Sequence, residues 1–65
     1  MEIHRIGEFR NGFCHCDVMQ IGSRIMYKSY VVKPDGSGRA DYHTAEQQLL
    51  LHELFKMALK KYGNE

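Results

Sequence analysis

The chain has no tryptophan, one proline and only two cysteines among its 65 residues. The cysteines, Cys14 and Cys16, are one residue apart, so a disulfide between them would not connect distant parts of the chain. A chain of this length buries only ~60% of the surface that its unfolded form exposes. We expect one small domain over residues 1–65, of a kind that often gains stability from a metal or a second subunit.

Long apolar runs and an excess of one charge are also absent. No segment approaches the ~20 apolar residues of a membrane span. Residues 1–9 lack the continuous apolar stretch of a signal peptide, so we expect a cytoplasmic protein with reduced thiols. Nine lysines and arginines nearly balance eight acidic residues. Strong nucleic-acid binders usually carry a dense basic patch, so this charge balance disfavours strong electrostatic binding to DNA. The lack of a long apolar run disfavours membrane insertion.

Glycine-containing turns predict a β-sheet in the first two thirds of the chain. Asn11-Gly12 and Gly22-Ser23 match two-residue hairpin loops, in which glycine supplies a positive φ. Residues 33–36, Lys-Pro-Asp-Gly, suit a type I turn with a bulge. These turns predict strands at 2–10, 13–21 and 24–33 and leave open a fourth at 38–43. In the fourth segment, burial favours a register with Ala40 and Tyr42, rather than Arg39 and Asp41, on the core face.

The hairpin loops also predict the register. In the first hairpin the predicted pairs are Arg10–Phe13, Phe9–Cys14, Glu8–His15, Gly7–Cys16 and Ile6–Asp17. In the second they are Ile21–Arg24, Val18–Tyr27, Asp17–Lys28, Cys16–Ser29, His15–Tyr30 and Cys14–Val31. Side chains alternate between the faces of a sheet. One face is therefore predicted to form the core, with Ile3, Phe9, Cys14, Cys16, Val18, Ile25, Tyr27 and Val31.

The same alternation bears on the motif Cys14-His15-Cys16, which resembles part of a metal site. The two cysteines share the core face, and His15 points the opposite way. A structural zinc site needs four ligands in tetrahedral geometry, and three consecutive strand residues do not converge on one ion. The other histidines, His4, His43 and His52, have no spacing typical of metal ligands. We predict that both cysteines are core residues, and that the chain holds no metal or other cofactor.

From Thr44 onward the apolar residues follow helical spacing. Thr44 and Gln47 form a capping-box pattern, and Gly63 follows two lysines where a glycine just past a helix end is expected. One stripe of the helix is apolar and should cover the cysteine face: Leu51, Leu54, Phe55, Ala58 and Tyr62. The predicted fold is α+β, a small antiparallel β-meander of three or four strands with one C-terminal α-helix packed on one face.

One helix cannot cover both faces of a sheet, so apolar surface is left over. The uncovered face is predicted to carry Glu8, His15, Asp17 and Lys28 together with Ile6, Phe13, Met19, Met26, Tyr30 and Val32, and Leu50 and Met57 widen the apolar part of the helix. A contiguous exposed apolar patch usually marks an interaction surface. The candidate partner-binding residues are Phe13, His15, Met19, Met26, Lys28, Tyr30, Val32, Leu50 and Met57.

No motif for catalysis is evident. Gly36-Ser37-Gly38 is too short for a phosphate loop, and buried cysteines are poor nucleophiles. The row Glu8, His15 and Tyr30 could relay protons, but on a sheet without a pocket it is more typical of a surface hydrogen-bond ladder. We predict no catalytic residue and no enzymatic activity.

Nucleic-acid binding through the uncovered sheet face is the alternative. Aromatic side chains with basic neighbours can stack bases, and the candidate residues are Arg10, Phe13, Lys28, Tyr30 and Arg39. From Gly12 to about Lys56, the succession of three strands, an Asp35-Gly36 turn and a helix opening with Thr44-Ala45-Glu46 resembles the arm-site DNA-binding domains of tyrosine recombinases. Those domains are typically much more basic than this chain. The resemblance implies DNA binding by the sheet.

Taken together, these features predict a non-enzymatic protein-binding module that acts as a homodimer or as a small inhibitor or adaptor. Short cytosolic domains of this kind are frequent in phages and mobile elements, where some inhibit host defence proteins. The partner is predicted to be a second copy or a foreign protein, with the sheet face slightly favoured over the helix flank.

Overall fold

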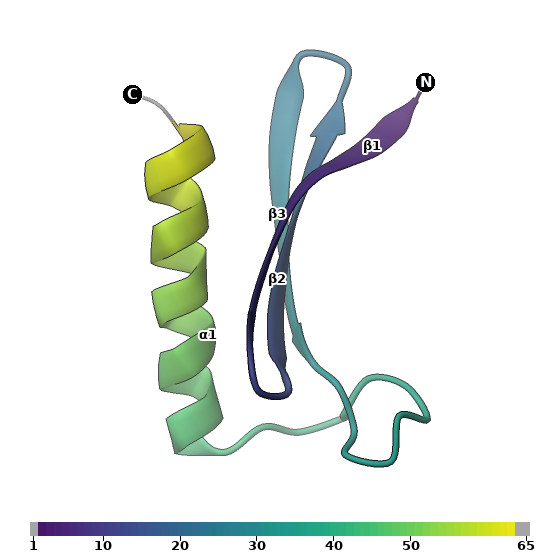
Figure 1. The fold of residues 1–65 in the computed structure, drawn as a ribbon, viewed down its shortest axis with the longest axis vertical. Helices are drawn as coiled ribbons and strands as arrows, with labels where there is room; N and C mark the ends of the chain where they lie inside the picture. The colour runs from purple at the N-terminus through teal and green to yellow at the C-terminus, as the bar shows by residue number, and fades with distance from the viewer. Residues whose placement is uncertain (1, 64–65) are drawn as a thin grey trace.

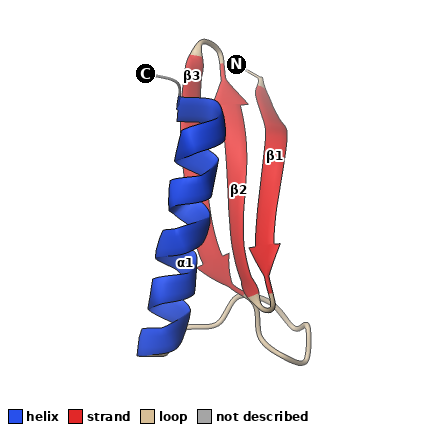
Figure 2. Ribbon diagram, turned by 60° about the vertical axis from the view of Figure 1, so that its left-hand side comes forward, coloured by secondary structure: helices blue, strands red, loops and turns tan. Residues whose placement is uncertain are grey.

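A computed structural model describes residues 2–63 and shows a three-stranded antiparallel sheet with one helix packed against it (Figure 1). The strands are β1 (Ile3–Asn11), β2 (Cys14–Ile21) and β3 (Arg24–Val31), in the spatial order β1-β2-β3. Helix α1 (Ala45–Ala58) continues into a π-helical turn, η1 (Leu59–Gly63). Figure 2 shows that α1 lies along one face of the sheet. The predicted α+β fold is confirmed, with three strands. Neither helical segment is long and apolar enough to cross a membrane within residues 2–63.

The β2–β3 hairpin has the predicted register throughout, from Ile21–Arg24 to Cys14–Val31. The β1–β2 hairpin does not, because its loop is Gly12-Phe13 rather than Asn11-Gly12. Gly12 then occupies the first central position with φ 63°, as Gly22 does in the other hairpin with φ 62°. A glycine with positive φ at that position is what a type II′ turn prefers. The pairing partners shift by two residues, an even number, so Cys14, Cys16 and Phe9 keep their predicted face.

A β-bulge between Arg5 and Gly7 overturns the predicted faces near the start of β1. The extra residue reverses the alternation, so that Ile6 packs against the core and Ile3, opposite Ile21, is exposed. The sequence alternation alone predicted the opposite for both isoleucines. The hydroxyl of Tyr62 donates a hydrogen bond to the Ile6 carbonyl oxygen at 3.0 Å. The bulge is thus held by a residue from the far end of the chain.

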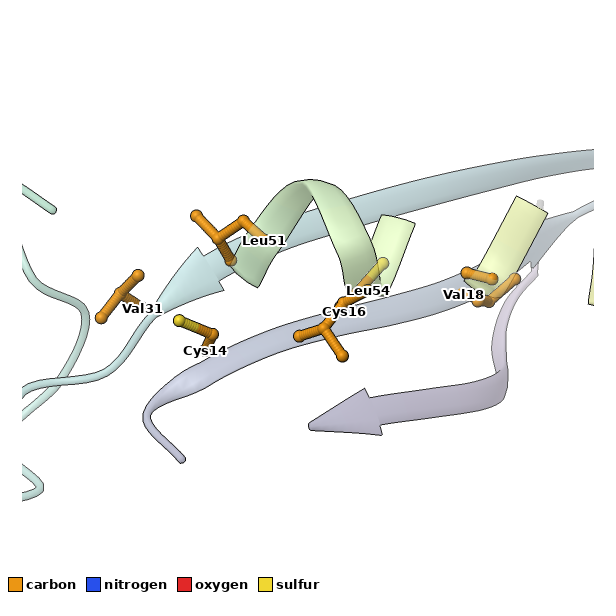
Figure 3. Close-up of a cluster of buried hydrophobic side chains, with 7 residues drawn as sticks. Cys14, Cys16, Val18, Val31, Leu51 and Leu54 are labelled. Carbon is orange, nitrogen blue, oxygen red and sulfur yellow. The ribbon is translucent and has the colours of Figure 1, made fainter. Parts of the chain in front are cut away.

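The core is small and lies between β2 and α1 (Figure 3). Its buried residues are Cys14, Cys16, Val18, Val31, Leu51, Leu54 and Ala58. Tyr62 packs at its edge, and Phe55 stacks edge-on against Tyr27 at 5.4 Å between ring centroids. The predicted helix stripe is therefore the one that covers the sheet. Both cysteines are free thiols buried in this core, which confirms their predicted role.

The two thiols should react slowly in the native state. Both are almost inaccessible to solvent, and burial raises the pKa of the Cys14 thiol, so that less of the reactive thiolate is present near neutral pH. We expect a thiol-specific reagent to label both cysteines quickly in denaturant and much more slowly in buffer. Fast, stoichiometric labelling of the folded protein would contradict their place in the core.

Helix α1 begins as predicted. The Thr44 hydroxyl accepts a hydrogen bond from the Gln47 backbone N–H at 3.1 Å, and the Gln47 side-chain oxygen accepts one from the Thr44 backbone N–H at 2.9 Å. The end differs from the prediction, because Gly63 closes the η1 turn without a positive φ. The helix therefore does not end at a left-handed glycine among the described residues.

Loss of the Thr44 hydroxyl should lower stability measurably. We expect Thr44→Ala to reduce the free energy of unfolding by ~1 kcal/mol, because one N–H of the first helical turn loses its partner. Thr44→Ser keeps the hydroxyl and is the matched control. Urea unfolding of the two variants measures the difference, and equal stability of Thr44→Ala and wild type would contradict the importance of the cap.

The segment between β3 and α1 forms a compact loop instead of a fourth strand. One bridge joins Val32 to Arg39, and the Ala40 N–H donates to the Val31 carbonyl at 2.7 Å. Ala40 packs partly against the core, as predicted. Tyr42, however, is 86% exposed, so its predicted burial is wrong. After Ala40 the chain must leave the sheet to reach the start of α1, which carries Tyr42 into solvent (Figure 1).

Candidate functional site

Within residues 2–63, no helix or strand covers the sheet face turned away from α1 (Figures 1 and 2). We call it the open sheet face. Residues opposite each other on neighbouring strands share a face, so the register fixes its members. From the β2–β3 loop toward the β1–β2 loop, its rows are Ile3, Ile21 and Arg24; Arg5, Met19 and Met26; Glu8, Asp17 and Lys28; and Arg10, His15 and Tyr30.

A polar cluster occupies the half of this face nearer the β1–β2 loop. The Tyr30 hydroxyl donates a hydrogen bond to Asp17 Oδ2 at 2.9 Å. The Tyr30 ring stacks on His15 with 5.2 Å between centroids and an interplanar angle of 10°. The Arg39 guanidinium lies 4.5 Å from the centre of the same ring. His15 and Asp17 are only 9% and 8% exposed, and the Tyr30 side chain lies against both of them.

Glu8 joins this cluster in a different way from the predicted row. It lies opposite Asp17 rather than His15, yet its Oε2 is 3.7 Å from His15 Nδ1 and its Oε1 is 4.0 Å from Arg5 Nη1. Lys28 lies opposite Asp17 as predicted, but the hydrogen-bond donor that reaches the carboxylate is Tyr30. His15 Nδ1 and Asp17 Oδ1 are buried without a hydrogen-bond partner among the described residues.

The titration of Tyr30 gives a measurable signature of the cluster. Burial, the hydrogen bond to Asp17 and the negative charges of Asp17 and Glu8 raise the pKa of the Tyr30 phenol above its usual value near 10, and Arg39 opposes this in part. The folded state favours the neutral phenol. The folding stability that this preference adds is fully present below pH ~10 and is lost as the pH rises through the folded-state pKa of Tyr30. We expect absorbance titration to show a late ionisation that Tyr30→Phe removes and Tyr42→Phe leaves. Ionisation of Tyr30 at the usual pH would contradict the cluster.

The end of the open sheet face near the β2–β3 loop is apolar. Met19 lies opposite Met26, and Ile3 lies opposite Ile21. We call these four residues the apolar cluster. Ile3 and Met26 are exposed, and Met19 and Ile21 are half-buried. Of its members, Met19 and Met26 were predicted from the sequence, whereas Ile3 and Ile21 were missed. For Ile3 the available signal was Gly7, since a glycine inside a strand often marks a bulge, and for Ile21 it was the regular alternation along β2.

The other predicted site residues are scattered. Phe13 is exposed in the β1–β2 loop, where its carbonyl accepts a hydrogen bond from the Val32 N–H, and Val32 itself is half-buried. Leu50 is half-buried and packs against the core, which explains it without a partner. Met57 is exposed on α1, away from the open sheet face. The predicted set therefore divides between the open sheet face, the β1–β2 loop and the helix.

A surface hollow lies between β3 and α1, where His43 and His52 come together with Gln48 and Phe55. Sequence spacing did not suggest that these two histidines are neighbours. Within residues 2–63 no three histidine, cysteine, aspartate or glutamate residues are grouped in a way that could hold a metal ion.

The chain matches no protein-family model, no curated protein and no solved structure. The likeness to the arm-site domains is therefore a similarity of layout alone. The open sheet face is the most distinctive part of the molecular surface.

Proposed function

We propose that the chain is a non-enzymatic protein-binding module whose partner docks on the open sheet face. The observation that carries this proposal is the apolar cluster, which stands exposed beside a polar network that is already ordered. Ordered side chains lose little conformational freedom on binding, so less of the interaction energy is spent in organising the surface.

The apolar cluster supports the proposal energetically. Complete burial of a methionine or isoleucine side chain contributes roughly 1.5–3 kcal/mol relative to leaving it exposed. Four such residues at one end of the sheet, beside Arg5 and Arg24, have the composition of an interface centre with a polar rim. On the other side of the sheet, α1 packs against the core residues of β2 and β3.

A chain of this size with one free face would act by occupying a surface of another molecule. We therefore propose a role as a small inhibitor or adaptor in the cytoplasm, in keeping with phage or mobile-element proteins directed at host factors. Self-association through the same face is the alternative form of this proposal. Sedimentation velocity at micromolar concentration distinguishes the two, since a homodimer sediments in a concentration-dependent way.

Two methionines of similar exposure provide the test. Met26, in the apolar cluster, is 49% exposed, and Met57, on α1, is 52% exposed. Immobilised wild type, Met26→Glu and Met57→Glu would be used to capture partners from cells of the source, after circular dichroism has shown that both variants fold. We expect one protein to be captured by wild type and Met57→Glu and lost with Met26→Glu. If Met57→Glu abolished capture and Met26→Glu left it intact, the interface would lie on the helix instead.

A further inference from the structure

Charge is segregated between the open sheet face and the rest of the molecule. Together with Arg39, which lies over its Tyr30 ring, the face carries five of the chain's nine lysines and arginines but only two of its eight acidic residues. The basic residues are Arg5, Arg10, Arg24, Lys28 and Arg39, and the acidic ones are Glu8 and Asp17. The remaining positions hold four basic and six acidic residues. Although the net charge of the whole chain is near zero, the open sheet face is cationic and the rest of the chain is acidic.

Both carboxylates of the open sheet face are engaged within it. Asp17 is buried and accepts the Tyr30 hydrogen bond, and Glu8 lies between Arg5 and His15. By contrast, Arg10, Arg24 and Lys28 form no ion pair with another described residue. The charge that this face presents to an approaching molecule is consequently positive.

We infer that the partner is a protein that presents carboxylates around an apolar centre. This inference rests on the proposed function and adds the chemistry of the partner. Arg5 lies beside Met19, and Arg24 lies beside Ile21, so cations border the apolar cluster on both outer strands. An apolar side chain of the partner would contact Met19 and Met26, and aspartates or glutamates next to it would meet these arginines and Lys28. Complementary charge of this kind speeds association and selects the partner.

A second copy of this chain fits the face poorly. A two-fold symmetric interface brings the same patch of both subunits together. Two open sheet faces would then place ten basic side chains against four carboxylates that are already engaged. Like charges brought together across an interface cost several kcal/mol, which favours a foreign, acidic partner.

Nucleic acid fits it poorly for a different reason. Base stacking needs a free aromatic surface, but the Tyr30 ring stacks on His15 and is covered by Arg39. Its hydroxyl is held by Asp17 as well. Among the predicted aromatic contacts, this leaves Phe13, which lies in a loop at the end of the sheet.

Selection from a random peptide display library tests the inference without knowledge of the natural partner. Selected peptides would be synthesised with a fluorophore, and their Kd measured by anisotropy against wild type, Met26→Glu, the double variant Arg10→Glu/Lys28→Glu and the matched double variant Lys56→Glu/Lys60→Glu on the helical side. A fluorescent oligo-dT would be measured in parallel. Circular dichroism would show that each variant folds.

We expect the selected peptides to be rich in acidic residues combined with apolar ones. The Arg10→Glu/Lys28→Glu variant should weaken their binding about tenfold or more, equivalent to ~1.4 kcal/mol. Lys56→Glu/Lys60→Glu should change it less than about twofold, and Met26→Glu should also weaken it. Added salt should lower the affinity for wild type, because the charges concerned are exposed.

The contrary outcomes are distinct. Peptides that depend on Met26 but lack acidic residues, and that tolerate Arg10→Glu/Lys28→Glu, would overturn the acidic partner and leave the proposed function intact. Peptides insensitive to both Met26→Glu and the Arg10→Glu/Lys28→Glu change, or a selection without any enriched peptide, would count against both. Tighter binding of oligo-dT than of any peptide, lost with Arg10→Glu/Lys28→Glu, would identify a nucleic-acid surface instead.

Discussion

Leu54→Ala should unfold a large fraction of the protein at room temperature. Leu54 is 4% exposed and belongs to the cluster that joins α1 to Cys16 and Val18 (Figure 3). Truncation of a buried leucine to alanine costs ~2–5 kcal/mol, because apolar contacts are lost and a cavity is left. A domain of 65 residues has a total stability of roughly 3–10 kcal/mol. The loss is therefore comparable with the whole stability of the fold.

Leu49→Ala is the matched control for this substitution. It makes the same chemical change in the same helix at a side chain that is 67% exposed. We expect its free energy of unfolding to stay within ~0.5 kcal/mol of wild type. Urea unfolding followed by circular dichroism measures both variants. If Leu49→Ala and Leu54→Ala lowered the free energy of unfolding equally, the helix would not pack on the sheet in the way described.

Gly7→Ala should destabilise the protein by ~1–3 kcal/mol, through a contact with a residue 55 positions away. A Cβ at Gly7 would lie 2.7 Å from Cζ of Tyr62 and closer still to its hydroxyl oxygen. Tyr62 would have to move, losing its hydrogen bond to the Ile6 carbonyl and its edge-on packing against Phe9. The φ of Gly7 is not in the left-handed region, so alanine itself is tolerated there by the backbone.

The effect of Gly7→Ala on stability should change sign when the Tyr62 side chain is removed. In a Tyr62→Ala background, Gly7→Ala has nothing to displace, and the lower entropy of the unfolded chain should stabilise the protein by ~0.4–1 kcal/mol. Tyr62→Phe alone should cost ~1 kcal/mol, since it removes only the hydrogen bond. A double-mutant cycle measures the coupling. An equal penalty for Gly7→Ala in both backgrounds would show that the steric cause lies elsewhere.

Local sequence signals were sufficient for about half of the architecture. The Gly22-Ser23 loop fixed the β2–β3 register, because a tight turn determines every pair that follows it. Thr44 and Gln47 fixed the start of α1 through hydrogen bonds three residues apart. The alternation of Cys14, His15 and Cys16 was likewise local, and it placed the cysteines in the core. In each case the interacting residues are close together in the chain.

The candidate site was only partly predictable. Its central residues, His15, Lys28 and Tyr30, lie on the two strands whose register the sequence specified. The edges of the site were not predictable, because their positions depend on β1 and on the loop that follows β3. The pair Asn11-Gly12 is compatible with two hairpin loops, Asn11-Gly12 and Gly12-Phe13. The loop that forms, Gly12-Phe13, places Glu8 opposite Asp17 and Arg10 opposite His15.

The sequence by itself determined the α+β fold, the face of the sheet that is buried, and the cap of its helix. Tertiary structure decided how the bulge at Ile6, of which Gly7 is a local sign, is held in place, since the hydroxyl that holds it belongs to Tyr62. It also decided the position of Arg39 over Tyr30, which a loop from outside the sheet provides. The cationic character of the open sheet face follows from both, because the bulge turns Arg5 onto it. Such contacts join residues far apart in the chain, where no local pattern of propensity or spacing records them.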